Sequence, residues 1–158
     1  MRNTISLTSL FAISLFLVAS HAQAATNYSG EWKMDAAKSD FGPQPAPEML
    51  VRTIKHNDPV IEISTHQKGA AGETTSQLKY TTDGKESTNK LPNGEAKGTA
   101  KWEGNNLVID STREFQGMNL ILRETWVLSG GGKVLTITNH ISIAGQGEFD
   151  QKLVLDKQ

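Results

Sequence analysis

The sequence contains no cysteine among its 158 residues. Disulfide bridges, thiolate metal sites and thiol nucleophiles are therefore excluded as sources of stability or chemistry. An excess of one charge is also lacking, because 16 lysines and arginines nearly balance 17 aspartates and glutamates. A formal net charge of −1 argues against nucleic acid or an anionic membrane surface as the main partner.

The one long apolar run lies at the start of the chain and predicts a cleaved secretory signal over residues 1–24. Arg2 gives a positive start, the run Leu7–Ala19 follows, and Ala22-Gln23-Ala24 matches the small-x-small pattern that signal peptidase recognises. The run is too short to span a bilayer, so we expect no membrane insertion of the mature chain; an uncleaved anchor is the alternative. Residues 25–158 are predicted to form one domain, exported to the periplasm or the extracellular space.

Turn signals recur at nearly regular spacing after residue 49. Asp-Gly, Asn-Gly and Gly-Gly pairs supply the positive φ angles that two-residue hairpin turns need. The runs between them are short, rich in β-branched residues and without a helical period. We predict an antiparallel meander of nine strands, preceded by one strand near residues 28–34. The signals are Asn57-Asp58-Pro59, Gly69-Ala70-Ala71-Gly72, Asp83-Gly84, Asn93-Gly94, Gly104-Asn105, Gln116-Gly117, Gly131-Gly132 and Gly145-Gln146-Gly147.

These turns also predict which residues lie opposite each other on adjacent strands. A slip of one residue would turn every side chain to the other face, so the pairing is informative. With each turn placed at its signal, one face stays mostly apolar through every hairpin, and we predict that it points inward. The predicted pairs are Tyr80 with Ser87, Leu78 with Asn89, Leu91 with Ala96, Ser87 with Ala100, Trp102 with Leu107, Ile109 with Glu124, Trp126 with Ile137, Ile143 with Phe149, Leu155 with Ile137, and Ile63 with both Leu78 and Ile54.

The opposite face is polar and is predicted to meet solvent. In the expected register Asp110, Arg123, His140 and Lys152 form one row across four strands, which we interpret as a surface ladder of ion pairs. A sheet of about ten strands usually closes or curls, since closure removes its unpaired edges. The predicted fold class is therefore all-β, an up-and-down antiparallel meander closed into a barrel, with a two-layer sandwich as the alternative.

A Gly-x-Trp pattern opens the first predicted strand, where the sequence reads Tyr28-Ser29-Gly30-Glu31-Trp32. In this position it resembles the calycin superfamily: lipocalins, fatty-acid-binding proteins and small exported bacterial lipocalin-like proteins. The resemblance implies that Trp32 packs inward at the closed end, that Gly30 allows close backbone approach, and that the barrel binds a small hydrophobic molecule. The lipocalin arginine that covers this tryptophan has no evident counterpart, because Lys152 and Lys157 are the only late cations.

The segment between the first two strands is proline-rich. Residues 35–38 have a pattern compatible with one helical turn, and residues 41–47 contain three prolines that favour an extended connector. We expect this connector to cross or cap one barrel end. No stretch fits the helix-turn-helix lid that is typical of fatty-acid-binding proteins.

Polar side chains interrupt the inward face, and a buried charge requires a partner, water or a ligand. One group (Arg52, Thr65, Ser76, Arg113) is predicted to share a layer, and Ala96, Gly98 and Ala100 would leave space beside it. We predict a ligand cavity in which the two arginines hold a carboxylate. The alternative is a wet barrel mouth, with Gly98 only relieving a bend. The predicted ligand-binding residues are Arg52, Tyr80, Trp102, Arg113, Glu124, Trp126, Asn139 and Gln151.

Signs of catalysis and of metal or cofactor binding are few. The sequence has no phosphate-binding glycine loop and no Gly-x-Ser-x-Gly elbow, and its histidines are not spaced as metal ligands. We therefore expect a non-enzyme without cofactor that binds a small apolar or anionic molecule. Two alternatives stay open: an envelope module that binds protein or glycan through a patch near Phe115 or Met118, and an enzyme with Glu124 as general base.

Overall fold

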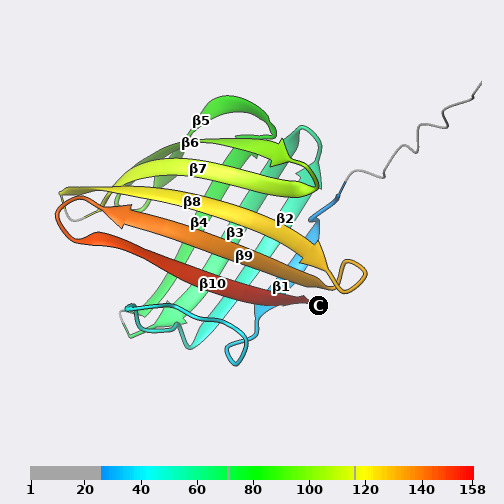
Figure 1. Ribbon diagram of the computed structural model, residues 1–158, viewed down its shortest axis with the longest axis horizontal. Coiled ribbons are helices and arrows are strands. Elements are labelled where there is room, and N and C mark those ends of the chain that lie inside the picture. The colour runs from blue at the N-terminus through cyan, green and yellow to red at the C-terminus, as the bar shows by residue number, and fades with distance from the viewer. Residues whose placement is uncertain (1–25, 71, 116) are drawn as a thin grey trace, which may run out of the picture.

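The computed structural model describes residues 26–70, 72–115 and 117–158, and of Phe115 only the backbone. The predicted signal at residues 1–24 lies outside these ranges. The chain forms one sheet of ten antiparallel strands, β4-β3-β2-β1-β10-β9-β8-β7-β6-β5, which curves into a nearly closed barrel (Figure 1). The strands are β1 (Gly30–Met34), β2 (Met49–Asn57), β3 (Val60–Gly69), β4 (Gly72–Thr81), β5 (Asp83–Leu91), β6 (Gly94–Glu103), β7 (Asn106–Phe115), β8 (Met118–Ser129), β9 (Val134–Ile143) and β10 (Gly147–Lys157).

The part of the chain that the structure describes holds no helix long and apolar enough to cross a membrane.

Most predicted strand registers are confirmed. The pairs across the β6–β7, β7–β8 and β8–β9 hairpins lie as expected, and so do those that join β2, β3 and β4. The confirmed pairs are Trp102 with Leu107, Ile109 with Glu124, Trp126 with Ile137, Ile63 with Leu78 and Ile54 with Ile63.

Two hairpins keep the predicted face but shift their partners by two residues. Leu91 pairs with Gly94 because the turn uses Pro92-Asn93, so Ser87 faces Gly98 and Asn89 faces Ala96. The β9–β10 turn is likewise tighter than predicted. A shift of two residues preserves the side-chain alternation, so the inward face survives. The corrected pairs at β9–β10 are Gly147 with Ile143, Phe149 with Ile141, Leu153 with Ile137 and Leu155 with Leu135, and Asp150 replaces Lys152 in the outer row beside His140.

The predicted hairpin at Asp83-Gly84 is wrong. Only Thr82 separates β4 from β5, and the two strands lie at opposite edges of the sheet, with no ladder between them in the described ranges. Thr82 is held away from hairpin geometry, because its N–H donates to the Pro59 carbonyl (2.8 Å) and its hydroxyl to Asp58 (2.6 Å). The barrel therefore has a seam between β4 and β5.

The connector between β1 and β2 continues the wall of the barrel beside β10. Asp35 N–H donates to the Val154 carbonyl (2.9 Å), and Asp40 and Lys152 exchange two backbone hydrogen bonds of 2.7 Å each. Residues 35–38, expected as one helical turn, form a hydrogen-bonded turn that is not part of a helix. Lys38 N–H donates to the Asp35 carbonyl (3.3 Å), and the Asp35 carboxylate accepts from the Ala37 N–H (3.0 Å). Phe41 from this connector packs against the main core.

The core consists of two apolar clusters. The larger one fills the end of the barrel where β1 begins, and its members include Tyr28, Trp32 and Trp126, all fully buried. The smaller one lies at the other end and consists of Leu120, Ile141 and Ile143, with half-buried Met118, Leu122 and Phe149 packed against it.

Trp32 points inward, as the Gly-x-Trp resemblance implies, and donates its indole N–H to the Tyr28 carbonyl (2.9 Å). The sequence showed no evident counterpart of the lipocalin arginine, but one of the two late lysines takes this position. The ammonium of Lys157 lies 5.2 Å from the centre of a Trp32 ring, which is within cation–π distance. A side chain at Gly30 would meet the Lys157 stem at 2.7 Å, so the glycine makes room for this lysine.

Gly98 generates a prediction about stability. A Cβ at this position would lie 2.5 Å from the Asp110 carbonyl oxygen and 2.8 Å from the Ser111 Cβ, because β6 and β7 approach closely here. The predicted added space at Gly98 is therefore absent, because β7 occupies it. Gly98→Ala is expected to lower the free energy of unfolding by roughly 1–3 kcal/mol in urea denaturation.

Gly69→Ala is the matched control for this prediction. Gly69 also lies in a strand, and the nearest atom to its added Cβ is 3.9 Å away. Its free energy of unfolding should change by about 0.5 kcal/mol or less. Equal destabilisation by the two substitutions would contradict the close approach of β6 and β7.

Candidate functional site

Two opposite charges meet inside the barrel. Arg52 on β2 and Glu124 on β8 come from strands that are not neighbours in the sheet, and Arg52 Nη1 lies 3.6 Å from Glu124 Oε1. Their side chains are only 13% and 8% exposed. Arg52 Nε also donates to the Thr65 hydroxyl (3.1 Å), and its guanidinium lies 5.3 Å from the centre of a Trp126 ring. These contacts hold the guanidinium in place.

Tyr80 on β4 faces the same region. Burial raises its pKa to about 12, and the negative charge of Glu124 adds to the rise. The Ser111 hydroxyl and the positive charges of Arg113 and Arg52 act in the opposite direction. The phenol is thus neutral at any physiological pH and donates or accepts hydrogen bonds without adding charge.

Several buried polar atoms around Glu124 have no hydrogen-bond partner within the described residues. They are Arg52 Nη1, Trp126 Nε1 and Asn139 Oδ1. Asn139 lies directly opposite Glu124 on β9, and Trp126 follows two residues later along β8. A buried polar atom without a partner loses about 1–3 kcal/mol relative to a paired one. Their concentration at one level of the barrel marks a candidate binding site.

Several side chains that point into the barrel between this level and the smaller cluster are half-buried, so solvent reaches them. Other inward-facing side chains at the same end, Leu120, Ile141 and Ile143, are buried. The half-buried inward-facing residues are Ser76, Ser111, Leu122, Asn139, Phe149 and Gln151.

The eight residues predicted to bind a ligand are only partly brought together. Five of them line the level described above: Arg52, Tyr80, Glu124, Trp126 and Asn139.

The other three lie apart from that level. Gln151 lies opposite Asn139 because of the two-residue shift between β9 and β10, and its Nε2 donates to the Phe41 carbonyl (3.2 Å). Trp102 stacks on Tyr28 at the closed end and donates to Asp58 (3.2 Å). Arg113 is exposed, as the wet-mouth alternative expects. Their ligand-binding roles stay predictions.

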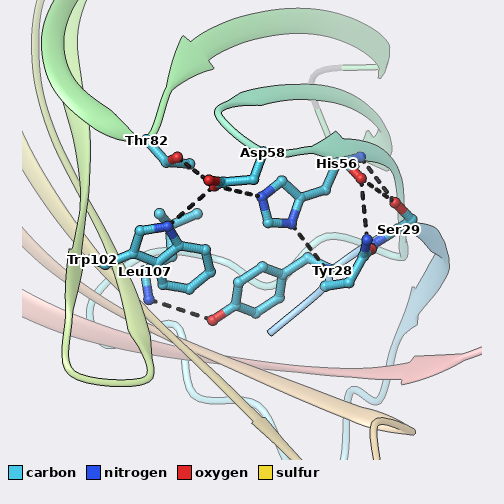
Figure 2. A network of polar contacts seen from close by, with 8 residues as sticks. Tyr28, Ser29, His56, Asp58, Thr82, Trp102 and Leu107 are labelled. Carbon is cyan, nitrogen blue, oxygen red and sulfur yellow. Dashed lines mark hydrogen bonds and ion pairs between the residues drawn. The ribbon is translucent and has the colours of Figure 1, made fainter. Parts of the chain in front are cut away.

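Sequence reasoning missed a polar network at the closed end, shown in Figure 2. Tyr28 N–H donates to His56 Nδ1 (3.3 Å), and His56 Nε2 lies 3.5 Å from Asp58 Oδ1. Because Nδ1 accepts a hydrogen bond, Nε2 is the atom that carries a hydrogen, and it faces Asp58 without forming a hydrogen bond within the described residues. The only sequence signal was that His56 shares the inward face of β2 with Arg52.

This network ties the start of the first strand to the rest of the barrel. Asp58 also accepts from Thr82 and Trp102, and these hydrogen bonds, Thr82 first, lower the pKa of its carboxyl group. The Tyr28 hydroxyl bridges the Trp126 carbonyl (3.1 Å) and the Leu107 N–H (3.3 Å). Every member binds a backbone group or another member, so we interpret the network as structural.

In the described parts of the chain no group of three or more histidines and carboxylates is arranged to hold a metal ion.

The chain's two tyrosines give a pH-dependent prediction. Burial raises the pKa of both Tyr28 and Tyr80 above 10, so their contribution to stability is complete below pH 10 and is lost as pH rises through the folded-state values. At pH 10 the native protein should therefore show clearly less tyrosinate absorbance than the chain in denaturant, which should show about half of the full signal. Half-ionisation at pH 10 with unchanged circular dichroism would contradict the burial of the two phenols.

No protein-family model matches the sequence, and no curated protein matches it. Solved structures do resemble it in fold. Zebrafish ileal bile acid-binding protein complexed with cholic acid is 22% identical, with a TM-score of 0.57 over 83% of this chain and 98% of that one. A secretory abundant heat soluble protein of Ramazzottius varieornatus is 12% identical, with a TM-score of 0.60 over 85% and 98%.

The fatty acid-binding protein from brain tissue of Drosophila melanogaster is also similar. It is 12% identical and has a TM-score of 0.53 over 82% of this chain and 99% of that one. At such low identities these likenesses bear on fold alone. The chain therefore shares with these proteins the fold of a barrel of antiparallel strands, ten in this chain.

Proposed function

We propose that the protein binds a small amphipathic molecule inside its barrel. The observation that carries this proposal is the set of unpartnered polar atoms at the level of Arg52 and Glu124, next to inward-facing side chains that solvent reaches. The polar part of the ligand would lie at this level. Its apolar part would lie against the smaller cluster, where Leu122 and Phe149 are half-buried.

The similar structures support a hydrophobic ligand. One is a bile acid-binding protein complexed with cholic acid, and another is a fatty acid-binding protein. We further propose that the mature protein acts outside the cytoplasm, which rests on the Arg2 start, the apolar run and the Ala22-Gln23-Ala24 pattern. Binding in the barrel does not depend on this second proposal.

The two alternatives have less support. An enzyme would need Glu124 free to accept a proton, and its carboxylate is engaged with Arg52. A surface module would need an apolar patch, but Ile121 and Val127 are the only large exposed hydrophobic side chains among the described residues. Arg123 lies between them on the same outward face of β8. Of the two residues predicted for such a patch, Met118 is half-buried, and the side chain of Phe115 lies outside the described residues.

A bulky residue inside the barrel tests the proposal. Leu122→Trp places a larger side chain in the accessible part of the interior and should weaken binding of the neutral fluorescent probe Nile red by about tenfold or more. Probe fluorescence titrated against protein concentration gives the dissociation constant.

Ile121→Trp is the matched control, because the neighbouring Ile121 side chain points outward and is 54% exposed. Its dissociation constant should stay within about twofold of the unmodified protein. If both variants bind Nile red as the unmodified protein does, the ligand site is not in the barrel.

Native mass spectrometry of protein from its own host should show one small molecule bound.

A further inference from the structure

We propose that the polar part of the ligand is an uncharged hydrogen-bonding group, such as an alcohol or a primary amide, and not a carboxylate. This inference rests on the proposed function, since it concerns a ligand at the level of Arg52 and Glu124. It differs from the sequence-based expectation, in which Arg52 and Arg113 together hold an anion.

The balance of charges inside the barrel disfavours a ligand carboxylate. An arginine side chain is always cationic in proteins, and Arg52 faces the Glu124 carboxylate at 3.6 Å. The two charges offset each other inside the barrel, where neither side chain is more than 13% exposed. A ligand carboxylate would add a second negative charge beside a single positive one. Burying a charge without its own partner is strongly unfavourable, whereas an uncharged group adds no such cost.

The position of Arg113 also disfavours a carboxylate. The expected carboxylate site needed two arginines, but Arg113 is exposed on β7, where it pairs with Leu120 and Ala96. Solvent screens its charge there. Among the described residues that point into the barrel, Arg52 and Glu124 are the only charged ones that are not exposed. A carboxylate at this level would therefore find no second buried cation.

The unpartnered atoms call for a group that both accepts and donates hydrogen bonds. Arg52 Nη1 and Trp126 Nε1 are donors, and Asn139 Oδ1 is an acceptor. The 3.6 Å contact of Arg52 Nη1 with Glu124 is an ion pair but is too long for a hydrogen bond, so this atom still has a hydrogen to donate. A group that matches them must accept hydrogen bonds and also donate one. A hydroxyl has one hydrogen to donate and two lone pairs, and a primary amide has both functions as well. A carboxylate has no hydrogen to donate, so it would leave Asn139 Oδ1 facing a negatively charged oxygen.

The contacts of Arg52 also oppose its capture by a ligand anion. Its guanidinium is held by the Thr65 hydroxyl, by Glu124 and by the Trp126 ring at once. A ligand anion would have to displace Glu124 to take this cation for itself. The carboxylate of Glu124 would then be buried without a partner, which opposes the exchange.

The experiment is a competition between ligands of one chain length. Lauryl alcohol, lauramide, laurate and laurylamine are each titrated at neutral pH against protein loaded with Nile red. The alcohol and the amide should displace the probe at concentrations about tenfold or more below that of laurate. A preference for laurate, or equal affinity for alcohol and laurate, would overturn the inference while leaving the proposed function intact.

Two variants locate the origin of the preference. Glu124→Gln removes the negative partner of Arg52, so the affinity ratio of laurate to alcohol should rise by about tenfold or more. Glu86→Gln removes an exposed carboxylate on β5 and should leave this ratio unchanged. An unchanged ratio in the Glu124 variant would show that the ion pair does not set the preference.

A further variant covers the case in which Glu124→Gln does not fold. Asn139→Leu removes the acceptor, and it should weaken the alcohol and the amide relative to laurate. The competition between the four ligands on the unmodified protein tests the preference without any variant. If Nile red and all four ligands fail to bind, the proposed function itself is wrong and the inference falls with it.

Discussion

The ion pair between Arg52 and Glu124 is the constraint on which the interior of this barrel depends. Two charges taken out of water are tolerable only when they meet each other and when their remaining polar atoms find partners. Strands β2 and β8 must therefore keep registers that bring the two side chains to the same level, on opposite walls of the barrel. A slip of one residue in either strand would turn its charge outward and leave the other unpaired.

The pair also divides the barrel into two unequal parts. On one side Tyr28, Trp32 and Trp126 fill the interior, and the His56 network ties the chain start to β2 and to the β4–β5 junction. On the other side a smaller apolar cluster leaves inward-facing side chains half-buried. The binding site that we propose therefore lies at one end, where the ion pair gives it a polar base without net charge. Selectivity would then come from hydrogen bonds and not from net charge.

Much of the fold could be predicted from turn chemistry, because the glycine-containing turns give the side-chain alternation of each strand. That alternation placed Tyr80, Trp126 and Ile137 on one face, and it survived two hairpins whose partners shift by two residues. Contacts beyond neighbouring strands could not be predicted. The meeting of Arg52 with Glu124 depends on the curvature of the closed sheet, and the seam at Thr82 depends on its hydrogen bonds to a distant turn.

The most direct test of this account is the NMR signal of the Trp126 indole N–H. The chain has three tryptophans, and the indoles of Trp32 and Trp102 already donate to protein acceptors, whereas Trp126 Nε1 has no partner among the described residues. On saturation with lauryl alcohol the Trp126 indole signal, assigned with Trp126→Phe, should shift while that of Trp32 stays in place. An unmoved Trp126 signal in protein shown to have bound the alcohol would contradict a ligand at the level of Arg52 and Glu124.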